Sequence, residues 1–288
     1  MKNPENLSDL LRNPRKRAWV ELLAKWYLGV RYHIHVSGQD HVQDLVEHSD
    51  RPFIVVSNHE GFWDGFIFGV LVPSLDFAIA KEEGWLNPLF RFFVQDLGGI
   101  PVARKEKLAQ MQRRYPSAFE HYISNDGRFK YGVYLPGSRA GDIVWDIMNT
   151  VGTYTDISTQ KPKRIGSVED LDAVILSQYV ILKGNRLLHF YQGTRMPNHS
   201  VEGIQYGLYN IASDLIEHHD LSIPILPSAI WYKDVKRWRS AVGVAFGEPL
   251  SSRLLLKRTA ENRHRHFMYD VKTEIEHQLL MAKKLCLL

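Results

Sequence analysis

A buried strand that runs into a polar segment and then into an apolar helix constrains the fold most strongly. Residues 52–57 (Pro-Phe-Ile-Val-Val-Ser) form a short apolar run, as in strands covered on both faces. Residues 58–64 follow directly, and residues 65–71 have the composition of a buried helix. In α/β folds, sites gather where a strand ends and a helix begins, so residues 58–64 become the first candidate site.

Strand and helix patterns alternate along the rest of the chain. Further strands are predicted at residues 32–38, 75–80, 98–104, 187–191, 223–231 and 241–246, and further helices at residues 85–97, 107–123, 201–218 and 260–288. Pro116 is expected to break or kink its helix, while residues 174–182 fit either a strand or a helix. The alternation predicts an α/β fold with a mixed central sheet flanked by helices.

Three segments are predicted. Residues 1–32 form a basic N-terminal amphipathic segment, with a helix over Ala18–Tyr32 whose apolar residues recur at roughly helical intervals. Such a helix suits a lipid interface or packing on its own domain. Residues 33–250 form the main domain, and residues 251–288 form a C-terminal helix.

Charge and cysteine content limit the class of partner. The net charge is +4 over 288 residues, which suits an anionic membrane surface or a phosphate-bearing substrate and is too weak to indicate nucleic acid. Cys286 is the one cysteine, so no disulfide framework or cysteine zinc site is expected. Without a visible secretory signal or a membrane-spanning run, a cytoplasmic protein peripheral to the membrane is predicted.

His59 and Asp64 are the candidate catalytic pair in residues 58–64. An imidazole with a pKa near ~6.5 can accept a proton at neutral pH, and a carboxylate on its other nitrogen fixes the tautomer. Such a pair can activate an alcohol for attack on an acyl carbonyl without a covalent intermediate. With 13 histidines and 32 acidic residues, however, this spacing also arises by chance, so the pair alone is a weak signal.

The surroundings of this pair resemble the glycerolipid acyltransferase family, which includes lysophosphatidate and glycerol-3-phosphate acyltransferases. The matching blocks are Ser57-Asn58-His59 through Asp64; Ala80-Lys81-Glu82-Glu83 with Asn87-Pro88-Leu89-Phe90 and residues 99–104; Phe190-Tyr191-Gln192-Gly193-Thr194-Arg195; and Ile223-Pro224-Ile225-Leu226-Pro227 with residues 244–249. Their order along residues 18–250 makes the resemblance specific and implies an acyltransferase-like fold.

The resemblance implies a role for each matched position. His59 is the expected general base and Asp64 its partner. Lys81, Arg104 and Arg195 are expected to bind the phosphate of the acceptor, since guanidinium and ammonium groups suit phosphate oxygens. The alternative for each of these cations is an ordinary surface ion pair, and without the matched blocks that alternative would be preferred for Lys81 and would compete for Arg104.

Gly193 and Thr194 belong to the same matched block and are expected to bind substrate. The Gly193 N–H would face the oxyanion of the acyl group, although a simple turn explains the glycine equally well.

The implied activity is that of a 1-acylglycerol-3-phosphate O-acyltransferase-like enzyme. A fatty acyl group would pass from acyl-CoA or acyl carrier protein to the hydroxyl of a lysophospholipid or glycerol phosphate at a membrane surface. The thioester supplies the activation, so no metal or other cofactor is expected.

Two departures from the family pattern qualify this interpretation. Tyr191 and Gln192 stand where the family usually has Pro-Glu, which changes the local charge. The interval between Arg104 and Phe190 is longer than usual, so residues 124–185 are interpreted as an insertion. Residues 135–139 are an alternative third block that matches fewer positions.

Other functions stay open. The same fold could serve a specialised non-phosphate acceptor, or it could be a non-catalytic lipid-binding protein, although the His59/Asp64 pair is intact. A metal hydrolase using His59, Glu60 and Asp64 lacks the usual ligand spacing. His33 and His35 alternate on a predicted strand and are expected on its exposed face rather than on a metal.

Overall fold

The computed structural model describes residues 14–47, 51–73, 75–81, 86, 99–102, 108–124, 129–131, 140–156, 159, 161–192, 201, 207–257 and 262–287. The chain divides into two compact units. The first comprises residues 1–20 and 76–183, and the second comprises residues 21–75 and 184–288.

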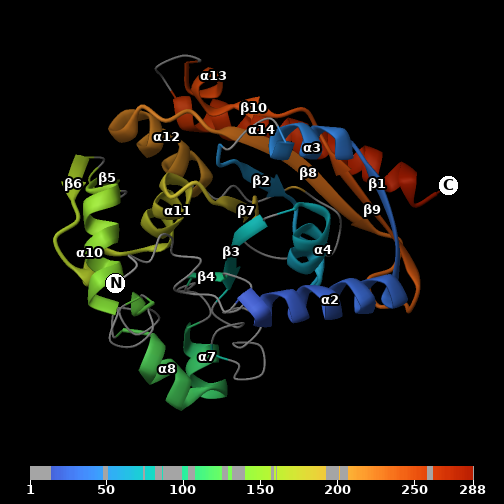
Figure 1. The fold of residues 1–288 in the computed structure, drawn as a ribbon, viewed down its shortest axis with the longest axis horizontal. Coiled ribbons are helices and arrows are strands. Elements are labelled where there is room, and N and C mark those ends of the chain that lie inside the picture. Colours follow the sequence, from blue (N-terminus) through green and yellow to red (C-terminus); the bar gives the residue numbers. More distant parts are fainter. Residues whose placement is uncertain are drawn as a thin grey trace. The chain divides into compact units, whose positions relative to one another are not determined.

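A mostly parallel sheet forms the centre of the second unit (Figure 1). Its strands follow the order β1 (Tyr32–Ser37), β9 (Ser240–Phe246), β8 (Pro224–Tyr232), β2 (Ile54–Ser57) and β7 (Arg186–Phe190). β1 runs parallel to β9, and β2 runs parallel to both β7 and β8, whereas β8 and β9 are antiparallel. β10 (Leu250–Ser251) pairs antiparallel with β8. All residues of β2 are buried, as their apolar run predicts.

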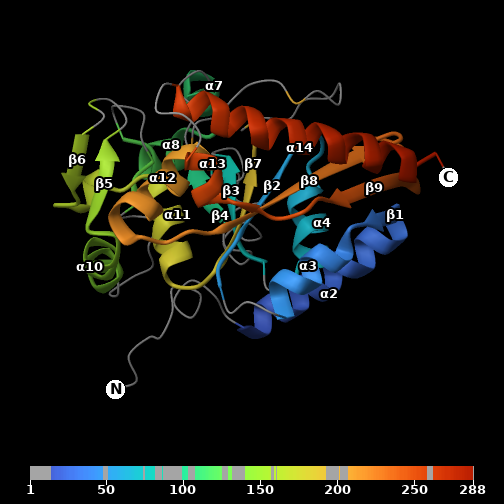
Figure 2. The same cartoon turned by 90° about the horizontal axis from the view of Figure 1, so that it is seen from above.

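Helices cover both faces of this sheet (Figure 2). α14 (Arg263–Leu285) lies on one face, where it packs against β8, β9 and β1. α3 (Gln39–Glu47) and α4 (Asp64–Leu71) lie on the other face, and α12 (Gly207–His219) and α13 (Ser252–Lys257) complete the unit. The fully buried Phe68 of α4 packs its ring against Phe190 and Phe246 at the ends of β7 and β9. This packing fixes α4 over the ends of the strands.

α2 (Pro14–Arg31) is the long helix near the N-terminus. Its buried Leu28 points into the second unit, and its last residue, Arg31, leads directly into β1. Within the part of the chain that the structure describes, no helix combines the length and apolar character needed to cross a bilayer.

The first unit combines a parallel strand pair with several helices. β3 (Leu75–Lys81) pairs with β4 (Gly99–Val102), followed by α7 (Leu108–Arg114), α8 (Pro116–Tyr122), α10 (Ala140–Val151), the hairpin of β5 (Thr153–Asp156) and β6 (Lys161–Arg164), η3 (Val168–Asp170) and α11 (Ala173–Leu182). Asp146 on α10 accepts hydrogen bonds from Tyr179 and Lys183, so it joins α10 to the end of α11.

The predicted α/β class is confirmed: the described strands form mostly parallel sheets flanked by helices. Pro116 separates α7 from α8, as its missing N–H predicts, and the ambiguous residues 174–182 are helical. Val201, the predicted start of a helix, is not helical, and α12 is described over Gly207–His219. α3 and α10 were not predicted, and the predicted helix over residues 85–97 lies almost entirely outside the described residues. The proposed domain boundaries stay a prediction.

Gly243 provides a test of how closely α14 lies on the sheet. A Cβ atom at this position of β9 would sit 1.9 Å from the backbone oxygen of Ala282 on α14. We expect Gly243→Ala to lower the free energy of unfolding by about 2 kcal/mol or more, because the helix must move away from the strand. Urea unfolding followed by circular dichroism measures the change.

Gly69→Ala is the matched control. Gly69 lies on α4, and a Cβ there meets nothing within 4 Å. Alanine is the better helix former, so this variant should be stabilised by about 0.5–1 kcal/mol. Equal stability of the two variants would contradict the close contact between β9 and α14.

Candidate active site

Residues 58–63 form the connection between β2 and α4, at the carboxyl end of a fully buried strand. Asp64 is the first residue of α4, and Trp63 is its N-cap residue. The polar segment between β2 and α4 therefore forms a turn at the carboxyl end of β2, which is a central strand of the sheet. This brings His59 back towards Asp64.

The Asp64 carboxylate is fully buried and organises the connection. Its Oδ2 atom accepts hydrogen bonds from the backbone N–H groups of Glu60 (2.7 Å) and Gly61 (2.9 Å) and lies 2.8 Å from His59 Nδ1. Its Oδ1 atom accepts a hydrogen bond from the Tyr232 hydroxyl at 2.6 Å. Burial and the Asp64 charge raise the pKa of Tyr232, so the phenol keeps its proton and remains a donor. Both carboxylate oxygens are thus satisfied by nearby donors.

His59 is oriented from two sides. Asp64 fixes the Nδ1 edge, and the ring stacks on Phe190, with centroids 4.1 Å apart and an angle of 19° between the planes. The residue is 8% exposed, so the imidazole lies almost wholly inside the protein. With Nδ1 directed at a carboxylate, Nε2 is the nitrogen that can accept a proton from a substrate.

Asn58 attaches the beginning of the connection to β8. Its Nδ2 atom donates to the Ile230 carbonyl oxygen (2.9 Å), and its Oδ1 atom accepts from the Ile230 N–H (2.8 Å). The side chain therefore continues the pairing of β2 with β8 by one step beyond Ser57. Because Asn58 is fully buried, this amide also satisfies two backbone groups that water cannot reach.

Gln192 supports the connection from the end of β7. Its Oε1 atom accepts the backbone N–H of His59 at 2.9 Å, and the side chain is buried. A glutamate oxygen could accept the same bond, so the amide keeps this contact and brings no charge. The neighbouring Tyr191 is buried too, and its hydroxyl donates to the Met268 carbonyl on α14 at 3.0 Å. Tyr191 and Gln192, which form the first departure from the family pattern, therefore each have a local structural role.

Glu60 is a buried carboxyl beside the pair. Burial, with a smaller contribution from the Asp64 charge, raises the pKa of Glu60 to about 9, so it is protonated at neutral pH. Asn58 Nδ2 donates to its Oε1 atom at 3.1 Å. The negative charge next to His59 therefore belongs to Asp64 rather than being shared with Glu60.

The structure describes only part of the predicted site. It brings His59 and Asp64 together. Lys81 ends β3 in the first unit, and its side chain is not among those described. The remaining predicted substrate-binding residues, Arg104, Gly193, Thr194 and Arg195, lie outside the described residues.

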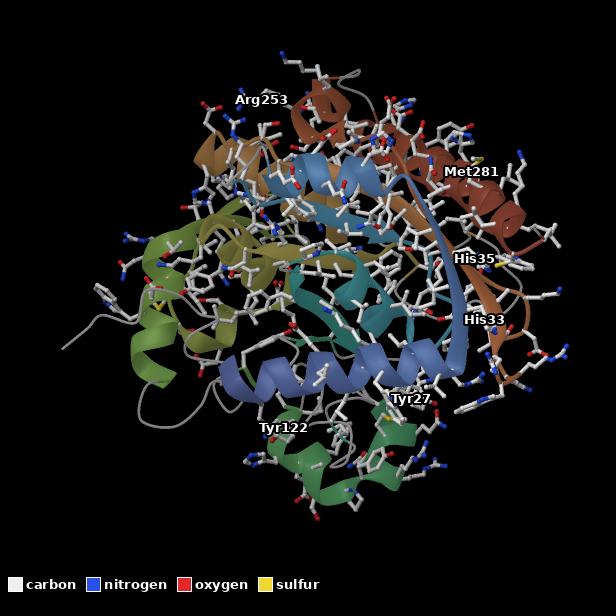
Figure 3. The ribbon with its side chains drawn as sticks, turned by 45° about the vertical axis from the view of Figure 1, so that its right-hand side comes forward. Tyr27, His33, His35, Tyr122, Arg253 and Met281 are labelled. Atoms are coloured by element: carbon white, nitrogen blue, oxygen red, sulfur yellow. The ribbon has the colours of Figure 1, made fainter. Side chains whose placement is uncertain are left out.

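The alternate histidines of β1 lie as expected. His33 and His35 are exposed on β1 (Figure 3). Among the described residues, no group of three or more His, Cys, Asp or Glu side chains is placed to hold a metal ion.

Tyr232 is the contact that sequence reasoning missed. It lies in β8, 168 residues after Asp64, and no local pattern links the two positions. The sequence suggests Glu60 only as a metal ligand. Its protonation follows from burial of the carboxyl, which depends on the fold and has no local sequence signal. β8 contacts this region through the backbone of Ile230, which binds Asn58, and through the Tyr232 hydroxyl, and neither contact leaves a local pattern in the sequence.

The arrangement suits proton transfer at a hydroxyl group. A buried imidazole with one nitrogen fixed by a carboxylate can accept a proton through the other nitrogen, and the carboxylate stabilises the resulting imidazolium. The orienting contacts come from β7, β8 and the connection itself, so the geometry is held by rigid elements.

Comparison with known proteins gives two matches. The profile of the family described as Acyltransferase matches residues 33–231. The fold is similar to that in the crystal structure of PlsC, the 1-acyl-sn-glycerophosphate (LPA) acyltransferase from Thermotoga maritima, with a TM-score of 0.50 and 17% sequence identity over 94% of this chain and 84% of that chain. No curated protein sequence matches the chain.

Removal of the Tyr232 hydroxyl tests whether Asp64 needs its donor. We expect Tyr232→Phe to lower the free energy of unfolding by about 2 kcal/mol, since it leaves a buried carboxylate oxygen short of a hydrogen bond. Tyr191→Phe is the matched comparison, because its hydroxyl binds a neutral carbonyl oxygen, and it should cost about 1 kcal/mol. Urea unfolding of both variants measures the difference, and a smaller loss for Tyr232→Phe would contradict the assignment.

The raised pKa of Glu60 predicts a pH dependence of stability. Between pH 4.5 and about 9 the folded protein holds a proton on Glu60 that the unfolded chain has released. The contribution of Glu60 to the free energy of unfolding is therefore fully present below pH 4.5 and is lost as the pH rises to about 9. Glu60→Gln cannot lose this proton, so its melting temperature relative to wild type should rise steadily over that range. If the melting temperatures of Glu60→Gln and wild type differ by the same amount at every pH in this range, Glu60 is ionised in the folded protein.

Proposed function

The chain belongs to the Acyltransferase family, and we propose that it transfers a fatty acyl group from a thioester to the hydroxyl of a lysophospholipid or glycerol phosphate. The observation that carries this proposal is the buried contact of 2.8 Å between His59 Nδ1 and Asp64 Oδ2. It orients the imidazole at the end of β2, within the segment that the family profile matches.

In the proposed mechanism, His59 acts as a general base. Its Nε2 atom takes the proton of the acceptor hydroxyl while the hydroxyl oxygen forms a bond to the acyl carbonyl carbon. Asp64 stabilises the imidazolium. Collapse of the tetrahedral intermediate breaks the carbon–sulfur bond, and the imidazolium returns its proton to the thiolate. The products are an ester and a free thiol, and His59 is neutral again.

The donor is proposed to be acyl-CoA or acyl carrier protein, and a lipid acceptor would place the enzyme at a membrane surface. Lys81, Arg104 and Arg195 remain the proposed phosphate ligands, with Gly193 and Thr194 at the acyl group. The neutral side chains of Glu60 and Gln192 support a phosphate acceptor, because they add no negative charge beside His59 to repel it.

Gln192 also motivates the second candidate, the same reaction with a specialised non-phosphate acceptor. An uncharged amide in place of the usual carboxylate is compatible with an uncharged acceptor. Thiol release measured with each class of acceptor decides between these two candidates.

Thiol release from acyl-CoA or acyl carrier protein tests the proposal. Wild type should release thiol with glycerol-3-phosphate or lysophosphatidate and not with a neutral lysolipid. His59→Ala should lower kcat at least ~100-fold, as expected for loss of a general base, and Asp64→Asn should also lower it because the imidazole loses its anionic partner.

His33→Ala is the matched control, since it removes an exposed imidazole from β1 of the same unit and should keep full activity. Activity confined to a non-phosphate acceptor would support the second candidate. Equal thiol release by wild type and His59→Ala would contradict a catalytic role for His59. No release with either donor would favour a lipid-binding protein.

A further inference from the structure

Large hydrophobic side chains are exposed on two adjoining elements of the second unit. Leu22, Leu23, Trp26 and Val30 are exposed on α2, and Val235 and Trp238 are exposed in the turn between β8 and β9. We call these α2 residues together with residues 233–239 the α2–turn surface. Apolar side chains gathered in this way mark an interaction site more often than scattered ones do.

The α2 residues form one stripe. Leu22, Trp26 and Val30 recur every four residues, so they lie above one another on consecutive turns, and Leu23 flanks them. Trp26 is 66% exposed. Leu28, on the opposite side of the helix, is buried, so the stripe is the side of this helix that faces away from the core of its unit.

The turn adds positive charge to this apolar stripe. All residues from 233 to 239 are exposed. Lys233, Lys236, Arg237 and Arg239 carry four positive charges against the one negative charge of Asp234, which gives a net charge of +3 within seven residues. Asp234 is engaged within the turn, where its Oδ1 atom accepts the backbone N–H groups of Lys236 and Arg237. The lysine and arginine side chains and Trp238 are therefore the groups of the turn that can contact a partner.

Arg31 attaches the turn to the end of α2. Its guanidinium donates to the carbonyl oxygens of Val235 (3.2 Å), Lys236 (3.0 Å) and Arg237, and it lies 5.2 Å from the centre of the Trp238 ring. The backbone N–H of Arg239 donates to the Arg31 carbonyl oxygen at 2.8 Å. These contacts hold the turn beside the C-terminal end of α2 (Figure 1), so the stripe and the cations belong to neighbouring elements that are attached to one another.

This surface adjoins the candidate active site. Tyr27 of α2, labelled in Figure 3, contacts both parts: its ring centroid lies 4.5 Å from that of Trp63, in the segment between His59 and Asp64, and 6.3 Å from that of Trp238. The next contact inward is the Tyr32 ring against Tyr232, whose hydroxyl binds Asp64. A partner on the α2–turn surface would therefore lie close to the catalytic pair.

We propose that the α2–turn surface docks on a bilayer that contains anionic lipids, with the turn at residues 233–239 contacting the headgroups. Tryptophan and aliphatic side chains next to clustered Lys and Arg are the combination that binds such an interface, since the apolar groups enter the lipid and the cations stay with the phosphates. An acidic protein such as acyl carrier protein would engage the cations but would leave the stripe of leucine, tryptophan and valine in water. The choice of a bilayer rests on the proposed function, whereas binding itself can be measured without turnover.

Flotation of the full chain with vesicles tests the proposal in the absence of substrate. One set of vesicles contains phosphatidylcholine alone, and the other contains about one-third phosphatidylglycerol, so the second carries a negative surface potential. The double variant Lys236→Gln/Arg237→Gln removes two exposed charges from the turn. The matched control, Lys161→Gln/Arg164→Gln, removes two exposed charges from β6 in the first unit.

Wild type should bind the anionic vesicles, and the turn variant should bind them roughly 30-fold more weakly, since each cation contributes roughly a factor of five at such a surface. The β6 control should bind like wild type. Trp26→Ser and Trp238→Ser should weaken binding to both kinds of vesicle, and a thermal unfolding midpoint equal to that of wild type shows that each variant is folded.

Thiol release separates this inference from the proposed function. With glycerol-3-phosphate, a water-soluble acceptor, the turn variant should keep wild-type activity if that acceptor is used at all. Equal vesicle binding by wild type, the turn variant and the β6 control would overturn the inference even if the enzyme is active. Unchanged vesicle binding together with weaker binding of acyl carrier protein would also overturn it and would identify the turn as a protein-docking site.

Discussion

The hydrogen bonding of one buried carboxylate determines the local structure on which the site depends. Asp64 is inaccessible to water, so its oxygens require donors from the protein, and a buried charge without them would cost several kcal/mol. The connection after β2 supplies two of these donors by turning its own N–H groups at Glu60 and Gly61 inwards. The glycine leaves room for this arrangement, because a Cβ atom at Gly61 would lie 3.1 Å from both Asp64 Oδ1 and the Tyr232 hydroxyl and would press on them. The orientation of His59 follows from this arrangement.

The charges around His59 follow from burial as much as from residue type. Glu60 is an acid in the sequence but carries a proton in the folded protein, and the Gln192 amide that accepts the His59 N–H is uncharged. Among the described residues in direct contact with this segment, Asp64 is thus the carboxylate that balances a protonated imidazole. Protonated Glu60 and uncharged Gln192 add no repulsion for an anionic substrate.

Sequence reasoning could find what is local and could not find what depends on distant contacts. His59 and Asp64 lie in one short segment between an apolar strand and an apolar helix, so both the pair and its place in the fold were predictable. Tyr232 was not, because its role depends on β8 lying beside β2. The protonation of Glu60 was not predictable either, because it depends on how much water the folded chain excludes. The placement of Arg104 and residues 193–195 is still a prediction from the family resemblance.

The strand order of the second unit also has a consequence for how the protein is made. β2 emerges from the ribosome early, yet one of its neighbours is β8, and the hydroxyl that completes the bonding of Asp64 is 168 residues further along the chain. At typical rates of synthesis this delay is on the order of ten seconds. During that interval an apolar strand with unpaired edges is available to other chains and to chaperones. The same long-range pairing that excludes water from the finished site therefore leaves β2 exposed to aggregation during translation.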